Sequence, residues 1–169
     1  LFPYTTLFRS FYLKRFHCDP HPGNFAFRED GCVIIYDYGG VKALSSMTLQ
    51  HFKQLIHAAR EGNIAELEQQ LTELHALSES GKFPEKLYRQ WLEVLLRPLT
   101  TDYDFAENSA HHDGMELVKP SLKYWDVFKP SPETLMVNRT VSGHYWNMIH
   151  LKMHDNIHDL FDELVPPRQ

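Results

Sequence analysis

Apolar residues recur every three or four positions over most of the chain, a spacing that predicts amphipathic helices. The first predicted helix begins behind the candidate capping serines at 45–46 and stops at the Gly-Asn pair at 62–63. A second amphipathic stretch follows over residues 64–74. We therefore predict a mainly α-helical fold, with helices filling residues 46–165.

A third helix is predicted between two prolines. Its pattern begins at Pro84 and stops at Pro98, positions where proline is compatible with the start and the end of a helix. Leu87, Trp91 and Leu95 lie at helical spacing within it. We expect this apolar stripe to face the core.

The C-terminal half contains one polar stretch between predicted helices. Residues 100–113 are polar and indicate a loop, and residues 115–128 resemble a helix interrupted by Pro120. The Ser-Pro-Glu sequence at 131–133 combines a cap, a proline and an acid in the order that begins a helix. A long helix is predicted from there, followed by a short one over 155–164.

The N-terminal part has a different pattern. Residues 25–29 and 32–38 are rich in β-branched and aromatic residues, and an Asp-Gly pair separates them at 30–31. This arrangement predicts a small β-hairpin over residues 25–38. The preceding segment, 17–24, contains two prolines and a glycine, so it is predicted to be a loop.

Composition narrows the class of protein. The 169 residues are 43% hydrophobic, enough for one domain with a core. Seventeen basic and 22 acidic residues give a net charge of -5 without long runs of either sign, which argues against nucleic-acid binding.

Cys18 and Cys32 do not suggest a disulfide framework, so we expect a reducing compartment. No stretch has the roughly 18 consecutive apolar residues of a membrane-spanning helix, so any membrane contact is expected to be peripheral.

The first ten residues do not fit the structural pattern of the rest of the chain. Residues 1–10, LFPYTTLFRS, match a translated sequencing-library adapter, and we expect them not to be native. The predicted domain is then 11–165, with a tail at 166–169. On this interpretation the natural protein continues upstream and the chain is a fragment.

The candidate chemistry lies in the predicted loop and at the end of the hairpin. The loop HCDPHPGN supplies Asp19 and Asn24, and the hairpin ends in the triplet Asp37-Tyr38-Gly39. Phosphoryl transfer needs a carboxylate that positions the nucleophile and oxygen ligands for the magnesium that bridges the phosphates. The hairpin is predicted to fold Asp37 back toward Asn24, which brings those groups together.

These motifs resemble the UbiB/AarF-like atypical kinase family. FHCDPHPGN matches the family's HxDPHPGN catalytic loop, YDYGG matches its metal-binding triplet, and PSPETLMVNRTVSGHYWNM is similar to its C-terminal helices. The resemblance covers roughly residues 11–165, more loosely in the middle. It implies the C-terminal lobe of a protein-kinase-like fold, with the nucleotide-clamping N-terminal lobe expected upstream.

The resemblance also implies roles for individual residues. Asp19 would be the catalytic acid, with His17 orienting the loop beneath it. Asn24 and Asp37 would be the magnesium ligands, and Gly39 would join them in binding the cofactor. These residues match the kinase signature at both motifs.

Two positions depart from the kinase pattern. Tyr38 stands where phenylalanine is usual, and Cys18 stands where regulated kinases carry an arginine that meets a phosphorylated activation loop. The first changes packing around Asp37. The second makes that kind of switch unexpected here.

The function implied by the resemblance is an atypical kinase or ATPase that uses ATP and Mg²⁺ in support of ubiquinone biosynthesis. Its expected partners are ATP, isoprenoid quinone precursors or lipid, and a biosynthetic complex, and not nucleic acid. Its expected location is cytoplasmic or peripheral on the cytoplasmic face of a membrane. This chain alone is expected to be inactive, because the parts that clamp the nucleotide would lie upstream.

Two alternatives share the kinase-like fold. Aminoglycoside and choline phosphotransferases also carry a His-x-Asp-x-His-Pro-Gly-Asn loop, so a small-molecule kinase stays open. A non-catalytic pseudokinase-like module that binds lipid or a partner is the other.

Two further alternatives involve metal ions. His17, Asp19 and His21 alternate as ligands of a metal hydrolase would. Three histidines at 150–158 recur every four residues and would share a helical face, which suggests zinc. Turn chemistry and a solvated helix face are the plainer explanations.

Overall fold

The computed structural model describes residues 12–78, 81–99, 103–107, 110–155 and 157–168. The segment 1–10, predicted to be an adapter, lies outside the described residues. Strands are found at β1 (Arg15–His17), β2 (Phe25–Phe27), β3 (Val33–Ile35), β4 (Val41–Ala43), β5 (Tyr103–Asp104) and β6 (His154–Asp155). Helices are found at α2 (Ser46–Glu61), α3 (Ile64–Glu73), α4 (Glu85–Leu96), α5 (Ala110–Ser121), α6 (Pro132–His150) and α7 (Ile157–Leu164), with short 3-10 turns η1 (Pro22–Asn24), η2 (Tyr38–Gly40), η3 (Arg97–Leu99) and η4 (Leu122–Tyr124).

The helix boundaries follow the capping residues of the sequence. The Ser45 hydroxyl accepts a hydrogen bond from the backbone of Thr48 at the start of α2, and Gly62 ends that helix in the left-handed conformation, with φ 66°. The Ser131 hydroxyl caps α6 in the same way, with Pro132 in the first turn. The predicted positions of these helices are confirmed.

The strands form three antiparallel pairs within the described residues. The predicted hairpin is confirmed as β2–β3, in which Phe25 faces Ile35. Its turn is closed by the Asp30 carboxylate, which accepts a hydrogen bond from the backbone of Cys32, and by Gly31 with φ 81°. The pairs β1–β4 and β5–β6 were not predicted, because strands of two or three residues carry too few positions for a period to be seen.

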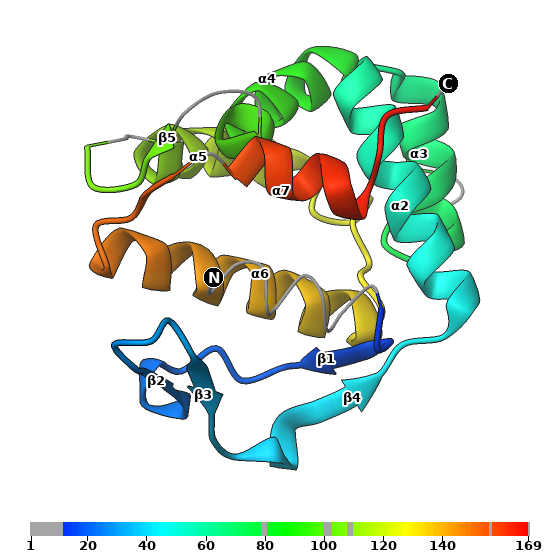
Figure 1. The fold of residues 1–169 in the computed structure, drawn as a ribbon. Helices are drawn as coiled ribbons and strands as arrows, with labels where there is room; N and C mark the ends of the chain where they lie inside the picture. Colours follow the sequence, from blue (N-terminus) through cyan, green and yellow to red (C-terminus); the bar gives the residue numbers. More distant parts are fainter. Residues whose placement is uncertain (1–11, 79–80, 100–102, 108–109, 156, 169) are drawn as a thin grey trace.

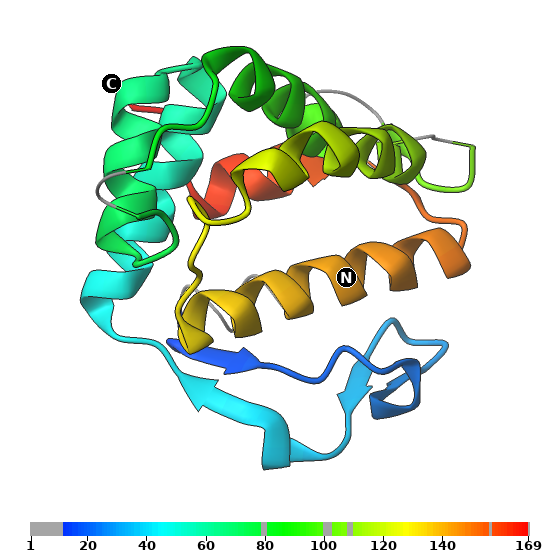
Figure 2. The same cartoon turned by 180° about the vertical axis from the view of Figure 1, so that it is seen from behind.

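The long helix α6 lies across the middle of the molecule (Figure 1). The strand pairs β1–β4 and β2–β3 lie on one side of it, and α4, α5 and α7 lie on the other, as the reverse view also shows (Figure 2). The helices α2 and α3 form an adjacent pair along one flank (Figure 1). The prediction of a mainly helical fold with a small β-hairpin is confirmed.

The largest apolar clusters lie on the helical side of α6. One gathers buried residues of α2, α3, α4 and the chain before α6: Ala58, Leu67, Leu77, Phe83, Leu87, Tyr88 and Val127. A second gathers residues of α4, β5, α5 and α7: Val94, Tyr103, Phe105, Ala110 and Ile157. The strand side has a smaller cluster, consisting of Phe16, Leu44, Leu49 and Val137.

Two predictions in this region are wrong. The polar stretch 100–113 is not only a loop: it contains β5 and the start of α5, and Tyr103 and Phe105 are each 1% exposed. The polar composition of this stretch did not indicate that two of its aromatic side chains are central to a core cluster. Of the predicted stripe on α4, Leu87 is buried as expected, but Leu95 is 62% exposed, because the helix turns Val94 inward instead.

Two remaining features concern helix ends and membranes. Pro120 lies in the last turn of α5 rather than near the middle of a helix. Within the part of the chain that the structure describes, no helix combines the length and the apolar character needed to span a bilayer.

Candidate active site

The catalytic loop brings Asp19 and Asn24 into direct contact. The side-chain nitrogen of Asn24 donates a hydrogen bond to Asp19 Oδ2 at 2.8 Å and lies 3.3 Å from the backbone oxygen of Asp19. The turn η1, in which the backbone N–H of Asn24 bonds the carbonyl of His21 at 3.0 Å, holds the two residues in this arrangement. The loop is therefore a compact turn closed by its own two functional side chains.

The hairpin brings Asp37 to the same end of the structure as Asn24. Tyr36, the neighbour of Asp37, donates its backbone N–H to the carbonyl of Asn24 at 2.8 Å. Asp37 itself has a left-handed backbone, with φ 51° and ψ 79°, and its Oδ1 accepts the N–H of Gly39 at 3.1 Å. Left-handed non-glycine residues are uncommon and tend to occur at functional sites, where the surrounding structure compensates the strain.

His17 fixes the backbone that carries Asp37. Its side chain is buried, and Nε2 lies 3.1 Å from the Asp37 carbonyl and 3.3 Å from the Tyr36 carbonyl. Because carbonyl oxygens only accept, Nε2 carries the hydrogen. This geometry is consistent with the predicted orienting role, which stays a prediction.

Two glycines let the chain pass close to these acids. A Cβ at Gly40 would lie 3.4 Å from the Asp19 Cβ, and the Gly40 carbonyl accepts the Cys18 N–H at 3.0 Å. A Cβ at Gly39 would lie 3.1 Å from Asp37 Oδ1. A side chain at Gly39 would therefore crowd the Asp37 carboxylate, whereas a Cβ at Gly40 would make an ordinary contact with Asp19.

Helix α6 supports the loop from the other side, a contact that the sequence analysis missed. A Cβ at Gly143 would lie 2.1 Å from the ring of Pro20, so only glycine allows this approach. One turn later, the Asn147 side chain donates a hydrogen bond to the Pro20 carbonyl at 2.8 Å. Gly143 and Asn147 are four residues apart, so they share a helix face. That spacing was the signal available in the sequence.

The electrostatics of the site favour an ionised Asp19. The hydrogen bond from Asn24 lowers the pKa of this carboxyl, and the backbone N–H of His21 and the charge of Arg139 add to the effect against a contribution from burial. A carboxylate with a lowered pKa is a weak base. Asp19 is therefore better suited to orienting a nucleophile by hydrogen bonding than to holding its proton for long.

The residues present fit a magnesium ion. Mg²⁺ prefers hard oxygen ligands and is usually held in proteins by one or two carboxylates together with substrate phosphates. Asp37 offers a carboxylate on the exposed side of the hairpin. The side-chain nitrogen of Asn24 donates to Asp19, so the amide oxygen of Asn24 points away from that hydrogen bond.

The competing metal sites find no support. Among residues outside the masked gaps, no three His, Cys, Asp or Glu side chains are grouped to hold a metal ion. The prediction that histidines 150–158 share a helix face is wrong, because α6 ends at His150 and His154 lies in β6. Lys152, with φ 48°, turns the chain between them. His21 Nδ1 accepts the N–H of Gly23 at 3.1 Å, which is turn chemistry.

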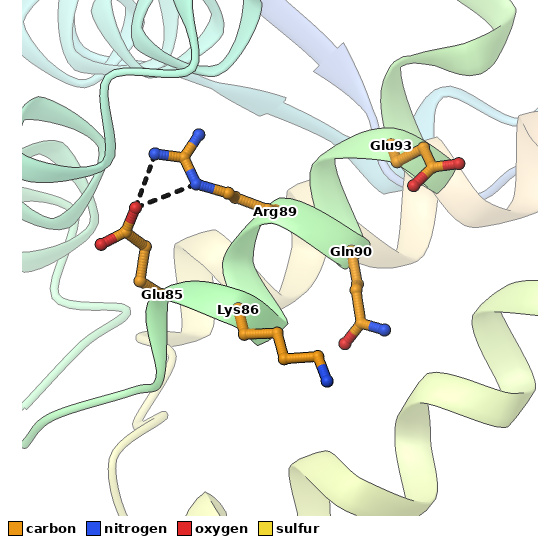
Figure 3. Close-up of a pocket in the computed structure, with 5 residues that line it drawn as sticks. All are labelled: Glu85, Lys86, Arg89, Gln90 and Glu93. Carbon is orange, nitrogen blue, oxygen red and sulfur yellow. Dashed lines mark hydrogen bonds and ion pairs between the residues drawn. The ribbon is translucent and has the colours of Figure 1, made fainter.

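A surface hollow of about 400 Å³ lies elsewhere, along α4. Its walls are charged and polar side chains of that one helix, and two of them form an exposed ion pair, Arg89 with Glu85 (Figure 3). Helix α4, which carries the hollow, lies on the other side of α6 from β1 and β2, the strands that flank the catalytic loop (Figure 1). Nothing in it matches the predicted chemistry.

A known protein family matches the segment of the chain that contains the candidate residues. Residues 4–71 match the family described as "ABC1 atypical kinase-like domain". Over 66 residues the chain is 35% identical to the protein ACTIVITY OF BC1 COMPLEX KINASE 7, chloroplastic, of Arabidopsis thaliana. This match covers 39% of this chain and 10% of that protein. The chain thus spans a tenth of the length of this relative.

A solved structure is similar over nearly the whole chain. It is described as the complex of Rv3197 with erythromycin from Mycobacterium tuberculosis, with a TM-score of 0.72, 18% identity, and coverage of 96% of this chain and 41% of that chain. At this identity the likeness shows the fold alone.

The fold and the two motifs together define a partial kinase-like lobe. Residues 4–71, which contain both motifs, are similar to the ABC1 atypical kinase-like domain, and this similarity supports the predicted UbiB/AarF-like atypical kinase family.

Proposed function

We propose that this chain carries the catalytic loop and the metal ligands of an atypical kinase or ATPase that uses ATP and Mg²⁺. The observation that supports this most is the hydrogen bond between Asp19 and Asn24, with Asp37 at the same end of the hairpin. Two acids and an amide of these types at one place are what phosphoryl transfer requires.

In this proposal Asp19 works on the nucleophile. It accepts a hydrogen bond from the attacking water or hydroxyl, whose oxygen forms a bond to the terminal phosphorus of ATP. The bond from that phosphorus to the bridging oxygen breaks, and ADP leaves. The proton of the nucleophile passes through the Asp19 carboxylate and ends on phosphate or solvent, so that water and ATP yield ADP and phosphate.

Asn24 and Asp37 would hold the metal, and His17 would keep the Asp37 backbone in place. Mg²⁺, when bound, would supply positive charge that neutralises the phosphates of the nucleotide. The left-handed backbone of Asp37 and its bond to the N–H of Gly39 direct the carboxylate. Gly39 contributes by leaving room beside the Asp37 carboxylate.

The biological role that we propose rests on the family resemblance. The complete protein would act in ubiquinone biosynthesis, on or near isoprenoid quinone precursors or lipid and with a biosynthetic complex. It would lie in the cytoplasm or peripherally on the cytoplasmic face of a membrane.

The test uses the complete protein expressed from its gene, because the chain covers only part of its relatives. We expect Mg²⁺-dependent ATP hydrolysis, and a fall of about 100-fold or more in kcat for Asp37→Asn and Asp19→Asn, as loss of a central electrostatic group produces. Asp126→Asn, an exposed acid before α6, is the control. Unchanged turnover in Asp37→Asn would overturn the proposal.

The main rival is a small-molecule phosphotransferase of the aminoglycoside or choline kinase type. The match of residues 4–71 to the ABC1 family favours the first function. Phosphorylation of an added aminoglycoside or of choline by the complete protein would reverse that preference. Tight Mg-ATP binding with no turnover would instead favour a pseudokinase-like module.

A further inference from the structure

Arg139 of α6 lies beside the catalytic acid without a structural reason of its own. Its guanidinium Nη2 is 3.9 Å from Asp19 Oδ1, and its side chain is 72% exposed. An ion pair this long and this exposed contributes about 0–1 kcal/mol to stability. The position of Arg139 therefore calls for an explanation other than folding.

The docking of α6 against the catalytic loop determines where Arg139 stands. Gly143, one turn further along, lies against Pro20, and Asn147, two turns further, binds the Pro20 carbonyl. Residues four apart share one face of a helix, so the same face that holds the loop also presents the guanidinium to Asp19. The placement is built into the fold, because two separate contacts set the register of this helix face.

The surroundings of Arg139 are suited to an anion. Lys42 of β4 and Arg139 are the two cations whose charges act on Cys18, the residue before Asp19. The loop thus has positive charge on its flank beside the Asp19 carboxylate. A planar guanidinium with several donors matches phosphate oxygens in two parallel hydrogen bonds, and the Arg139 side chain is largely exposed.

We infer that Arg139 binds the terminal phosphoryl group of the nucleotide while that group is transferred. The inference rests on the proposed function. Asp19 must contact the nucleophile, and a nucleophile ready to react lies roughly 3–3.5 Å from the phosphorus. The oxygens of the phosphoryl group then come within the reach of a flexible side chain whose guanidinium already lies 3.9 Å from Asp19. As charge develops on those oxygens, the guanidinium stabilises it.

The experiment compares Arg139→Ala and Arg139→Lys with a matched control in the complete protein. Arg89→Ala also removes an exposed arginine from an ion pair: its side chain is 58% exposed, and it belongs to α4, which lies on the other side of α6 from β1 and β2. Steady-state ATP hydrolysis and the Kd values of Mg-ADP are measured for each. We expect Arg139→Ala to lower kcat by about 100-fold or more, since arginines that contact the transferred phosphoryl group are worth about 10³–10⁵ in rate.

Three further readouts separate contact with phosphate from a structural role. Mg-ADP, which lacks the terminal phosphoryl group, is expected to bind Arg139→Ala within about three-fold of its wild-type Kd, because the lost contact is made only to that group. Added guanidinium is expected to restore part of the rate of Arg139→Ala and none in Arg89→Ala. Arg139→Lys, which keeps the charge without the planar fork, is expected to be intermediate.

Two results would overturn the inference while leaving the proposed function in place. One is a kcat for Arg139→Ala within two-fold of that of Arg89→Ala, while Asp37→Asn still abolishes turnover. The other is a loss that guanidinium does not restore and that Mg-ADP binding shares, which marks Arg139 as structural. A wild-type protein that binds no Mg-nucleotide would overturn the proposed function itself, and this inference with it.

Discussion

The two sides of α6 are held together by different forces. On the helical side, Tyr103 and Phe105 are almost completely buried and pack with their rings 4.7 Å apart in an edge contact. On the strand side, Asp19, Asn24 and Asp37 are arranged by hydrogen bonds within short loops, over a small apolar cluster. Apolar burial thus builds the scaffold, and the site depends on α6 and on a few polar contacts for its geometry.

The largest effect on stability is expected from the helical side. Phe105→Ala removes a ring that is 1% exposed, so the free energy of unfolding should fall by about 3–5 kcal/mol. Phe27→Ala, on the hairpin and 52% exposed, is the control and should cost much less. Urea unfolding followed by circular dichroism measures both. Equal losses would contradict the division of the molecule into these two parts.

The next effect concerns a buried histidine between the two sides. His144 of α6 makes an edge contact with Phe25, with ring centres 5.5 Å apart. Burial, with a smaller contribution from His17, lowers the pKa of His144 to about 4. The unfolded chain takes up this proton as the pH falls below about 6.5, whereas the folded chain takes it up only near 4. Stability from the neutral imidazole is therefore complete above about 6.5 and is lost as the pH falls toward 4.

Across that window the free energy of unfolding should drop by on the order of 3 kcal/mol from this group. His144→Phe cannot take up a proton, so its stability should change less between pH 7 and pH 5. Chemical unfolding at the two pH values measures the difference. A variant with the same pH dependence as the wild type would show that His144 is not responsible.

A smaller effect tests the contact between α6 and the catalytic loop. Gly143→Ala places a Cβ 2.1 Å from the Pro20 ring, and the forced shift should cost about 1–3 kcal/mol and reduce ATP turnover. Gly114→Ala in α5 is matched, because its Cβ would meet Trp91 at an ordinary 3.7 Å. Thermal unfolding and steady-state hydrolysis are measured together. If both glycine variants behave alike, α6 does not hold the loop through Gly143.

The smallest effect is expected at the other end of the same contact. Asn147→Ala removes the donor to the Pro20 carbonyl, which should cost about 0.5–1.5 kcal/mol. Asn138→Ala, an exposed position on the same helix, is the control. Thermal unfolding resolves the pair, and hydrogen exchange of the loop amides should be faster in Asn147→Ala only. Identical exchange in the two variants would mean that Asn147 does not position the loop.

The features predicted well from the sequence depend on residues that are close together in the chain. Caps such as Ser45 and Ser131 act within a turn of the helix that they begin, and the Asp-Gly turn of the hairpin acts within four residues, so these elements were found. The site motifs were found because their residues lie close together in the chain.

What the sequence did not predict depends on distant contacts. The pairing of Tyr103 with Asp155 joins segments far apart in the chain, and a two-residue strand has no period to reveal it. The approach of Gly143 to Pro20 likewise joins α6 to the catalytic loop. A glycine within a helical pattern permits a close approach, but only the fold shows whether one occurs and to which residue.

The central claim is that Asn24 and Asp37 hold the metal of a bound nucleotide. Its most direct test is a titration of the complete protein with Mn²⁺ and ATP, followed by electron paramagnetic resonance, for the wild type, Asp37→Asn and Asp126→Asn. We predict that Asp37→Asn raises the Kd of the metal by about ten-fold or more, since losing a carboxylate ligand removes a charged contact worth at least about 1.4 kcal/mol, while Asp126→Asn leaves it unchanged. Equal Kd values in the three proteins would contradict the account.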